Sequence, residues 1–133
     1  DGFRRDLLSL VTFNVVIGNG DAHSKNYSLM LGRRGEVSLA PLYDAAPVRY
    51  VAARFKNTGH VIHGRTSLDW VDADDLVSEA VTWGMSKTRA QGTVEHVLEA
   101  TWEAAHAVPL PDGTQDVLAK LEAMWARRSW RPV

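Results

Sequence analysis

The tripeptide Gly18-Asn19-Gly20 separates two apolar stretches that cannot share one regular structure. Before it, residues 3–17 place apolar side chains at helical spacing, which predicts an amphipathic helix that ends at Gly18. After it, two short β-prone runs flank the turn GRRG, which predicts a hairpin over residues 27–40. Two glycines around an asparagine favour irregular backbone, so we expect residues 18–26 to form a loop between the helix and the hairpin.

The remaining sequence predicts a short loop and then mostly helix. Two prolines bound the segment 41–47 and prevent regular structure there. Residues 52–65 show no clear period, so no element is assigned to them. Acidic residues, Ser86 and Thr114 suit helix N-termini, and they predict helices over 70–85, 86–108 and 115–130 within a helical remainder of 66–131. The expected fold class is therefore mainly α with one β-hairpin.

Composition narrows the classes of protein that this chain can represent. Its 133 residues, with 45% hydrophobic and 23% charged content, suit one globular domain. With 15 basic and 16 acidic residues, the chain gives no direct signal for nucleic acid or for a membrane surface. There is no cysteine, which excludes disulfides and thiolate chemistry. No apolar run approaches the roughly 20 residues of a membrane span and the start does not resemble a signal peptide, so we expect a cytoplasmic protein.

Polar side chains are concentrated in the loop after the first helix. Asp21 and Asn26 lie five positions apart on this loop, and Asp44 follows the hairpin that returns the chain. Three oxygen-bearing side chains can therefore converge, and asparagine and aspartate oxygens are suitable ligands for Mg²⁺. A carboxylate that does not bind the metal remains free to accept a proton. This arrangement is the pattern that protein kinases use for phosphoryl transfer.

The stretches FNVVIGNGDAHSKNYSLML and LAPLYDAAPV, within residues 13–48, resemble the HipA family of serine/threonine kinases. The best-known member of that family is a bacterial persistence toxin paired with a DNA-binding antitoxin. The resemblance implies that Asp21, in the motif G-x-x-D-x-H-x-K-N, is the catalytic base. It implies that Asn26 and Asp44, the latter in P-x-Y-D, are the Mg²⁺ ligands. It also implies that the nucleotide side of the site contains His23, Ser24, Lys25, Asn26, Tyr43 and Asp44.

By this resemblance, residues 1–133 form the C-terminal, helical lobe of a kinase-like fold. The lobe would comprise a catalytic loop at 18–26, the hairpin at 27–40, a metal-binding segment at 41–47 and the helical remainder. A kinase also needs an N-terminal lobe that covers the phosphates and binds adenine, and no pattern for it is present in this sequence. We therefore expect the isolated chain to be inactive. The implied partners are ATP, a protein substrate such as an aminoacyl-tRNA synthetase, and a DNA-binding antitoxin.

Three alternative functions remain open. Small-molecule phosphotransferases of the aminoglycoside and choline kinase type also use G-D-x-H-x-x-N, but they usually have histidine where this chain has Asn19. A non-catalytic lobe that binds a partner is the second alternative. A metal-dependent hydrolase is the third, and it would need more metal ligands than three positions supply.

Other polar and aromatic residues have simpler interpretations. The histidines outside the loop lack a third ligand at zinc spacing and are interpreted as structural, namely His60, His63, His96 and His106. The five tryptophans are expected mainly in the core. The tail WARRSWRPV, residues 125–133, is interpreted as a solvated helix end rather than as a surface for stacking on RNA.

Overall fold

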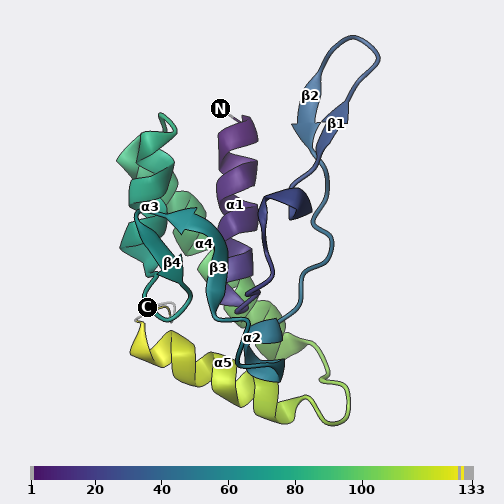
Figure 1. Ribbon diagram of the computed structural model, residues 1–133, viewed down its shortest axis with the longest axis vertical. Helices are drawn as coiled ribbons and strands as arrows, with labels where there is room; N and C mark the ends of the chain where they lie inside the picture. Colours follow the sequence, from purple (N-terminus) through teal and green to yellow (C-terminus); the bar gives the residue numbers. More distant parts are fainter. Residues whose placement is uncertain (1, 129, 131–133) are drawn as a thin grey trace.

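The computed structural model describes residues 2–128 and 130, so parts of the tail and the end of the expected helical remainder lie outside this description. The described chain is mainly helical with two small antiparallel hairpins (Figure 1). Its helices are α1 (Gly2–Val16), α2 (Val48–Val51), α3 (Ala73–Thr82), α4 (Lys87–Ala107) and α5 (Gln115–Arg127), with one 3-10 turn, η1 (Ser24–Asn26). Its strands are β1 (Leu29–Leu31), β2 (Val37–Leu39), β3 (Asn57–Ile62) and β4 (Arg65–Ser67).

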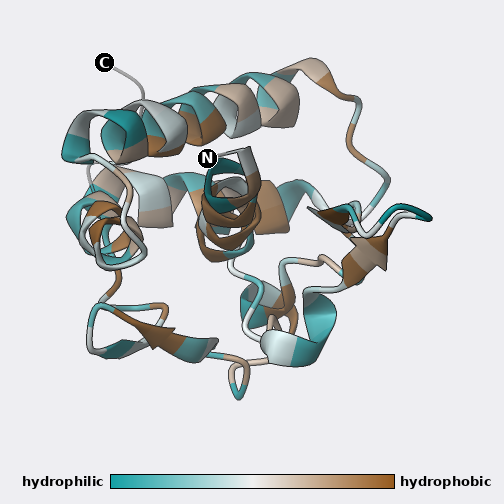
Figure 2. Cartoon of the chain, turned by 90° about the horizontal axis from the view of Figure 1, so that it is seen from above, coloured by the Kyte–Doolittle hydropathy of each residue, from teal (hydrophilic) through white to brown (hydrophobic). Residues whose placement is uncertain are grey.

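Helix α1 forms the centre of the core. It packs against α4 and α3, and Figure 2 shows its apolar turns in the middle of the fold. Leu8 and Val16 are almost fully buried, at 0% and 1% exposure. Burying such a side chain contributes about 1.5–3 kcal/mol to folding. The helical spacing of apolar residues in the sequence therefore corresponds to the surface that fixes α1 in place.

The end of α1 has the hydrogen bonds of a Schellman motif. The Gly18 amide donates to the Val15 carbonyl at 3.1 Å, and the Asn19 amide donates to the Asn14 carbonyl at 2.8 Å. Gly18 has φ of 73°, the left-handed conformation that this motif requires and that glycine adopts without strain. The expected stop at Gly18 is confirmed, and the chain leaves α1 in a fixed direction.

The expected mainly helical class is confirmed, but the expectation of a single hairpin is wrong. The second hairpin, β3 and β4, begins in residues 52–65, to which no element was assigned. It ends at Ser67, so the expected helical remainder from residue 66 is wrong at its start, and the first helix after the hairpin begins at Ala73. Its register shifts between Asn57 and Ile62, and Gly59, His63 and Gly64 have positive φ values of 78°, 46° and 78°. Burial alternates along β3, but the inward positions hold Thr58, His60 and Ile62 while Val61 is exposed, so the apolar residues do not alternate in the sequence.

The first hairpin extends away from the helices (Figure 1). Leu29 pairs with Leu39, and Leu31 pairs with Val37, in the antiparallel register of β1 and β2. Both Leu31 and Val37 are more than half exposed. The hairpin therefore acts as an arm that returns the chain from η1 to the segment before α2.

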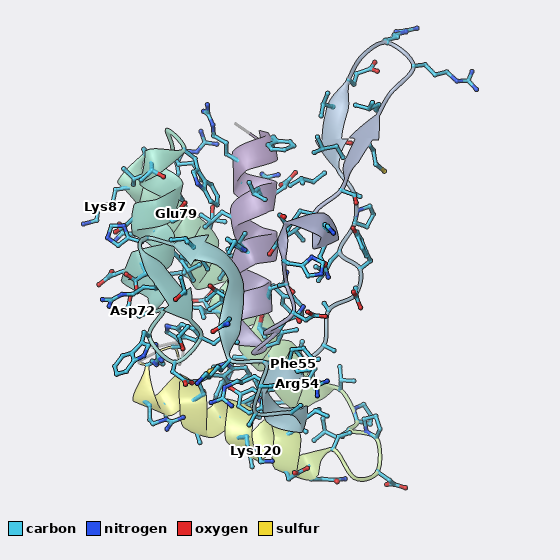
Figure 3. The ribbon with its side chains drawn as sticks, in the orientation of Figure 1. Arg54, Phe55, Asp72, Glu79, Lys87 and Lys120 are labelled. Atoms are coloured by element: carbon cyan, nitrogen blue, oxygen red, sulfur yellow. The ribbon has the colours of Figure 1, made fainter. Side chains whose placement is uncertain are left out.

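Capping fixes the start of α3. Asp72 accepts a hydrogen bond from the Asp75 amide at 2.9 Å, and the Asp75 side chain accepts one from the Asp72 amide at 3.2 Å. Figure 3 shows Asp72 at the start of this helix, with Glu79 further along it. Such a capping box satisfies two backbone donors that the first turn leaves unpaired.

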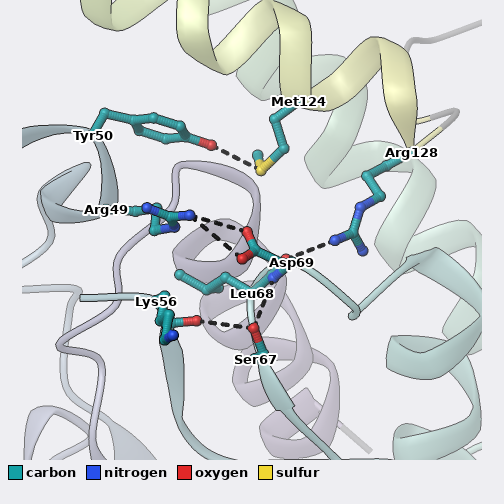
Figure 4. Close-up of polar contacts among 8 residues, drawn as sticks. All are labelled: Arg49, Tyr50, Lys56, Ser67, Leu68, Asp69, Met124 and Arg128. Carbon is teal, nitrogen blue, oxygen red and sulfur yellow. Dashed lines mark hydrogen bonds and ion pairs between the residues drawn. The ribbon is translucent and has the colours of Figure 1, made fainter. Parts of the chain in front are cut away.

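Polar contacts hold α2 against α5 and the chain after β4 (Figure 4). The Arg49 guanidinium pairs with the Asp69 carboxylate at 3.3 Å, and the Tyr50 hydroxyl donates to the Met124 sulfur at 2.8 Å. Burial raises the pKa of Tyr50 to about 12, so this phenol remains a donor at neutral pH. The segment that precedes α2 is therefore anchored at its C-terminal end.

Helix α5 packs across the C-terminal end of α1. Side-chain N–H groups of α5 and of the residue after it donate to backbone carbonyls at the end of α1 and before α3. Trp125 is buried, and its indole Nε1–H donates to the Val16 carbonyl at 2.8 Å. The Arg128 guanidinium donates to the carbonyls of Val71 and Leu68 at 2.6 and 3.2 Å. Trp125 and Trp130 are both 2% exposed, so the interpretation of the tail as a solvated helix end is wrong for these residues. None of the helices in the described residues is both long and apolar enough to cross a membrane.

Candidate active site

The loop after α1 presents most of its polar side chains to solvent. Asp21, His23 and Lys25 are exposed, whereas Asn26 is only 7% exposed at the end of η1. The His23 amide donates to the Asp21 carbonyl at 2.8 Å, and the Asn26 amide donates to the His23 carbonyl at 2.9 Å. Ser24, the first residue of η1, is also exposed. The loop is therefore a sequence of tight turns that fixes Asn26 and leaves the Asp21 carboxylate accessible.

Asn26 and Asp44 are in direct contact. The Asn26 Nδ2 donates to the Asp44 Oδ2 at 3.1 Å, although the residues are 18 positions apart. The hairpin formed by β1 and β2 produces this contact by reversing the chain between them. Asp44 has φ of 54°, in the left-handed region that most non-glycine residues avoid and that aspartate and asparagine enter more readily.

Tyr43 closes the base of the same hairpin. Its hydroxyl donates to the Lys25 carbonyl at 2.8 Å and lies 2.7 Å from the Ser28 Oγ. The side chain remains 43% exposed. Tyr43 thus fixes the segment before Asp44 against the loop and keeps part of its ring accessible to a ligand.

Sequence reasoning did not identify the role of Asn19, whose side chain lies between the loop and the segment of Asp44. Asn19 is 2% exposed, and its Nδ2 donates to the Asn14 Oδ1 at 2.8 Å and to the Asp44 carbonyl at 3.3 Å. Its Oδ1 accepts from the Asp21 amide at 3.3 Å. The sequence analysis used Asn19 as part of a helix stop and to distinguish the chain from small-molecule phosphotransferases, and these distant contacts leave no pattern in the sequence.

Strand β3 and the chain before it support the underside of the loop. A Cβ atom at Gly20 would overlap the Phe55 carbonyl, and one at Gly59 would overlap the Ala22 carbonyl. Figure 3 shows Phe55 beside Arg54 after α2, and the Arg54 guanidinium lies 4.7 Å from the centre of the Phe55 ring. The two glycines therefore permit backbone segments to approach more closely than side chains would allow.

His60, which the sequence analysis interpreted as structural, lies on β3 next to this loop. Burial lowers the pKa of His60, and a hydrogen bond with the Ala22 backbone partly opposes that effect. The Tyr27 ring meets the imidazole edge-on, with ring centres 5.9 Å apart. Burial also raises the pKa of Tyr27. These two aromatic groups act as uncharged packing beneath the loop at neutral pH.

A comparison with known families matches most of the chain. Residues 3–106 match the family described as the HipA-like C-terminal domain. The chain belongs to this family. A protein of Sinorhizobium fredii (strain NBRC 101917 / NGR234) named "Putative kinase Y4mE" is 30% identical over 102 residues, which make up 77% of this chain and 24% of that protein. The chain thus spans about a quarter of the length of this relative, and α5 lies beyond the family match.

The side chains of the HipA-like site include oxygen ligands of the kind that Mg²⁺ prefers. Asn26 and Asp44 lie side by side, with the amide nitrogen of Asn26 facing the carboxylate. The amide oxygen of Asn26 and the carboxylate of Asp44 are the kinds of hard ligand that Mg²⁺ selects, and the amide would turn its oxygen to the ion. Within residues 2–128 and 130, no group of three histidine or acidic side chains is arranged to hold a metal. A magnesium ion at this pair would accordingly take its other ligands from water and phosphate, as Mg²⁺ usually does in nucleotide sites.

The close approach at Gly20 yields a stability prediction for the HipA-like loop. We expect Gly20→Ala to lower the free energy of unfolding by about 1–3 kcal/mol, because the new methyl group must displace the Phe55 backbone. Gly92→Ala in α4 is the matched control, since no atom lies within 4 Å of its added Cβ. That control should gain up to about 1 kcal/mol from helix propensity. Urea unfolding of both variants measures the difference, and equal stabilities would contradict the close packing described above.

Proposed function

We propose that this chain is the catalytic C-terminal portion of an ATP-dependent serine/threonine protein kinase of HipA type. The observation that carries the proposal is the contact between Asn26 and Asp44, with Asp21 on the same loop. Family membership and the relative named as a kinase support it. The helices packed beneath the loop correspond, in this proposal, to the C-terminal lobe of a kinase-like fold.

The proposed reaction uses two sets of side chains. Asn26 and Asp44 would hold Mg²⁺ with the β- and γ-phosphates of ATP, and the bound ion would neutralise charge on those phosphates. Asp21 would orient the acceptor hydroxyl and accept its proton. Tyr43 and the exposed residues of the loop, His23, Ser24 and Lys25, would contact the nucleotide. Positioning and charge neutralisation supply most of the rate enhancement in such reactions.

The biological setting is a further part of the proposal. A HipA-type kinase would act in the cytoplasm as the toxin of a toxin-antitoxin pair, in which a DNA-binding antitoxin controls it. Its substrate would be a protein of translation, such as an aminoacyl-tRNA synthetase. In the whole enzyme, further segments would cover the nucleotide, because the lobe described above supplies only part of the contacts that ATP needs.

Transfer of labelled phosphate tests the proposal. We expect the whole enzyme, given Mg²⁺ and ATP labelled at the γ-phosphate, to label serine or threonine in protein from a bacterial extract. Removing Mg²⁺ with a chelator should abolish the labelling. Aminoglycosides and choline serve as competing acceptors in parallel reactions. Labelling of these small molecules instead of protein would favour the alternative phosphotransferase, and labelling of neither would contradict the proposed function.

A further inference from the structure

Asn19 uses its whole side chain in contacts between three segments. It follows Gly18 in the Schellman motif, so its backbone is held by the last turn of α1. Its amide nitrogen donates to the Asn14 side chain and to the Asp44 carbonyl, and its oxygen accepts from the Asp21 amide. Helix α1, the loop and the segment before α2 therefore meet at one buried amide.

Only an amide of this length meets these requirements. The contacts need two N–H donors and one acceptor, which is what the asparagine side chain offers. A carboxylate would keep the acceptor and lose both donors, and it would set an oxygen against the Asn14 Oδ1 and the Asp44 carbonyl. A serine could replace at most one of the donors. The far end of the network is fixed because the Asn14 Nδ2 donates to the Tyr27 hydroxyl at 3.2 Å.

Asp44 depends on this network for its conformation. Its φ of 54° lies in the left-handed region, which is less favourable than extended or helical backbone even for aspartate, a residue that enters it more readily than most. Two contacts oppose that preference, since Asn19 holds the Asp44 carbonyl and Asn26 holds its carboxylate. In this conformation the Asp44 carboxylate lies against the Asn26 amide.

We propose that Asn19 is a positioning residue that holds the backbone of Asp44 and of Asp21 in fixed relation. The inference rests on the proposed function, in which Asp44 binds the metal and Asp21 accepts the proton. Asn19 itself touches neither metal nor substrate in this scheme. It acts through the carbonyl of one aspartate and the amide of the other, and so sets the spacing between them.

Mn²⁺ binding and the backbone of Asp44 test the inference in the chain itself. We expect Asn19→Asp to weaken Mn²⁺ binding, followed by electron paramagnetic resonance, by roughly 10–100-fold, the usual effect of removing a group that orients a metal ligand. The NMR chemical shifts of the Asp44 Cα and Cβ atoms should move away from the values typical of left-handed backbone. Asn57→Asp is the charge control, because Asn57 is exposed on β3. Asn19→Ser replaces Asn19→Asp if the latter does not fold.

A control for stability separates positioning from general damage. Leu121→Ala, at a buried position of α5, should lower the melting temperature without changing Mn²⁺ affinity or the Asp44 shifts. The inference is overturned if the Asn19 variant keeps both wild-type readouts, or if the Leu121 variant loses Mn²⁺ binding equally. A wild-type chain that binds no Mn²⁺ would count against the proposed function alone. The Asp44 shifts would then decide the inference about Asn19.

Discussion

Replacing Asp21 with asparagine is expected to lower the rate of phosphate transfer by the whole enzyme by roughly 10²–10⁴. The carboxylate is exposed and its own backbone amide is held by Asn19, so the change removes a proton acceptor and leaves the loop intact. ATP·Mg²⁺ binding should persist, because Asn26 and Asp44 are unchanged. The measurements are single-turnover transfer rates and ATP affinity by calorimetry.

The matched control for Asp21→Asn is Asp112→Asn. Asp112 is an exposed aspartate in the turn between α4 and α5, so the control removes the same charge at a distance from the loop. It should leave transfer and binding unchanged. Loss of ATP binding in a folded Asp21→Asn protein, or transfer within a few-fold of wild type, would show that Asp21 is not the base.

The local motif was the part of the site that sequence could predict. Residues 13–48 carry the spacing of the HipA-like loop, and the family match confirms that resemblance. The contact between Asn26 and Asp44 follows from a short hairpin, whose geometry is determined by residues close together in the chain. The functional roles of Asp21, Asn26 and Asp44 remain predictions. Local sequence patterns are thus enough to predict which residues meet where one turn and one hairpin bring them together.

The residues that pack against the loop could not be predicted from the sequence, because their positions depend on contacts between distant segments. Gly59 and His60 lie beneath the loop only because β3 packs there, and residues 52–65 show no alternation that would predict a strand. Asn19 appeared to be part of a helix stop, yet its amide reaches Asp44, 25 positions away. The partners in a buried polar network are determined by the three-dimensional positions of the residues. The sequence shows no periodic pattern from which those partners could be predicted.

Replacing Asp44 with asparagine is expected to affect a different step from Asp21→Asn. The change removes the negative charge that would bind Mg²⁺ and keeps the shape of the side chain, so ATP·Mg²⁺ affinity should fall by at least about 10-fold while transfer also slows. Raising the Mg²⁺ concentration should restore part of the lost affinity, because the weakened interaction is with the metal. Calorimetry at two Mg²⁺ concentrations measures both effects.

The Asp44→Asn result discriminates between metal binding and a purely structural role. If Asp44 only stabilised the hairpin base, its variant would lose thermal stability and the loss of ATP binding would not respond to Mg²⁺. Asparagine tolerates the left-handed conformation that Asp44 adopts at φ of 54°, so the backbone should remain as it is and the melting temperature should change little. ATP·Mg²⁺ binding as tight as wild type in this variant would exclude Asp44 as a metal ligand. Because Asp21→Asn should keep nucleotide affinity and Asp44→Asn should lose it, opposite results for the two would reverse the assigned roles.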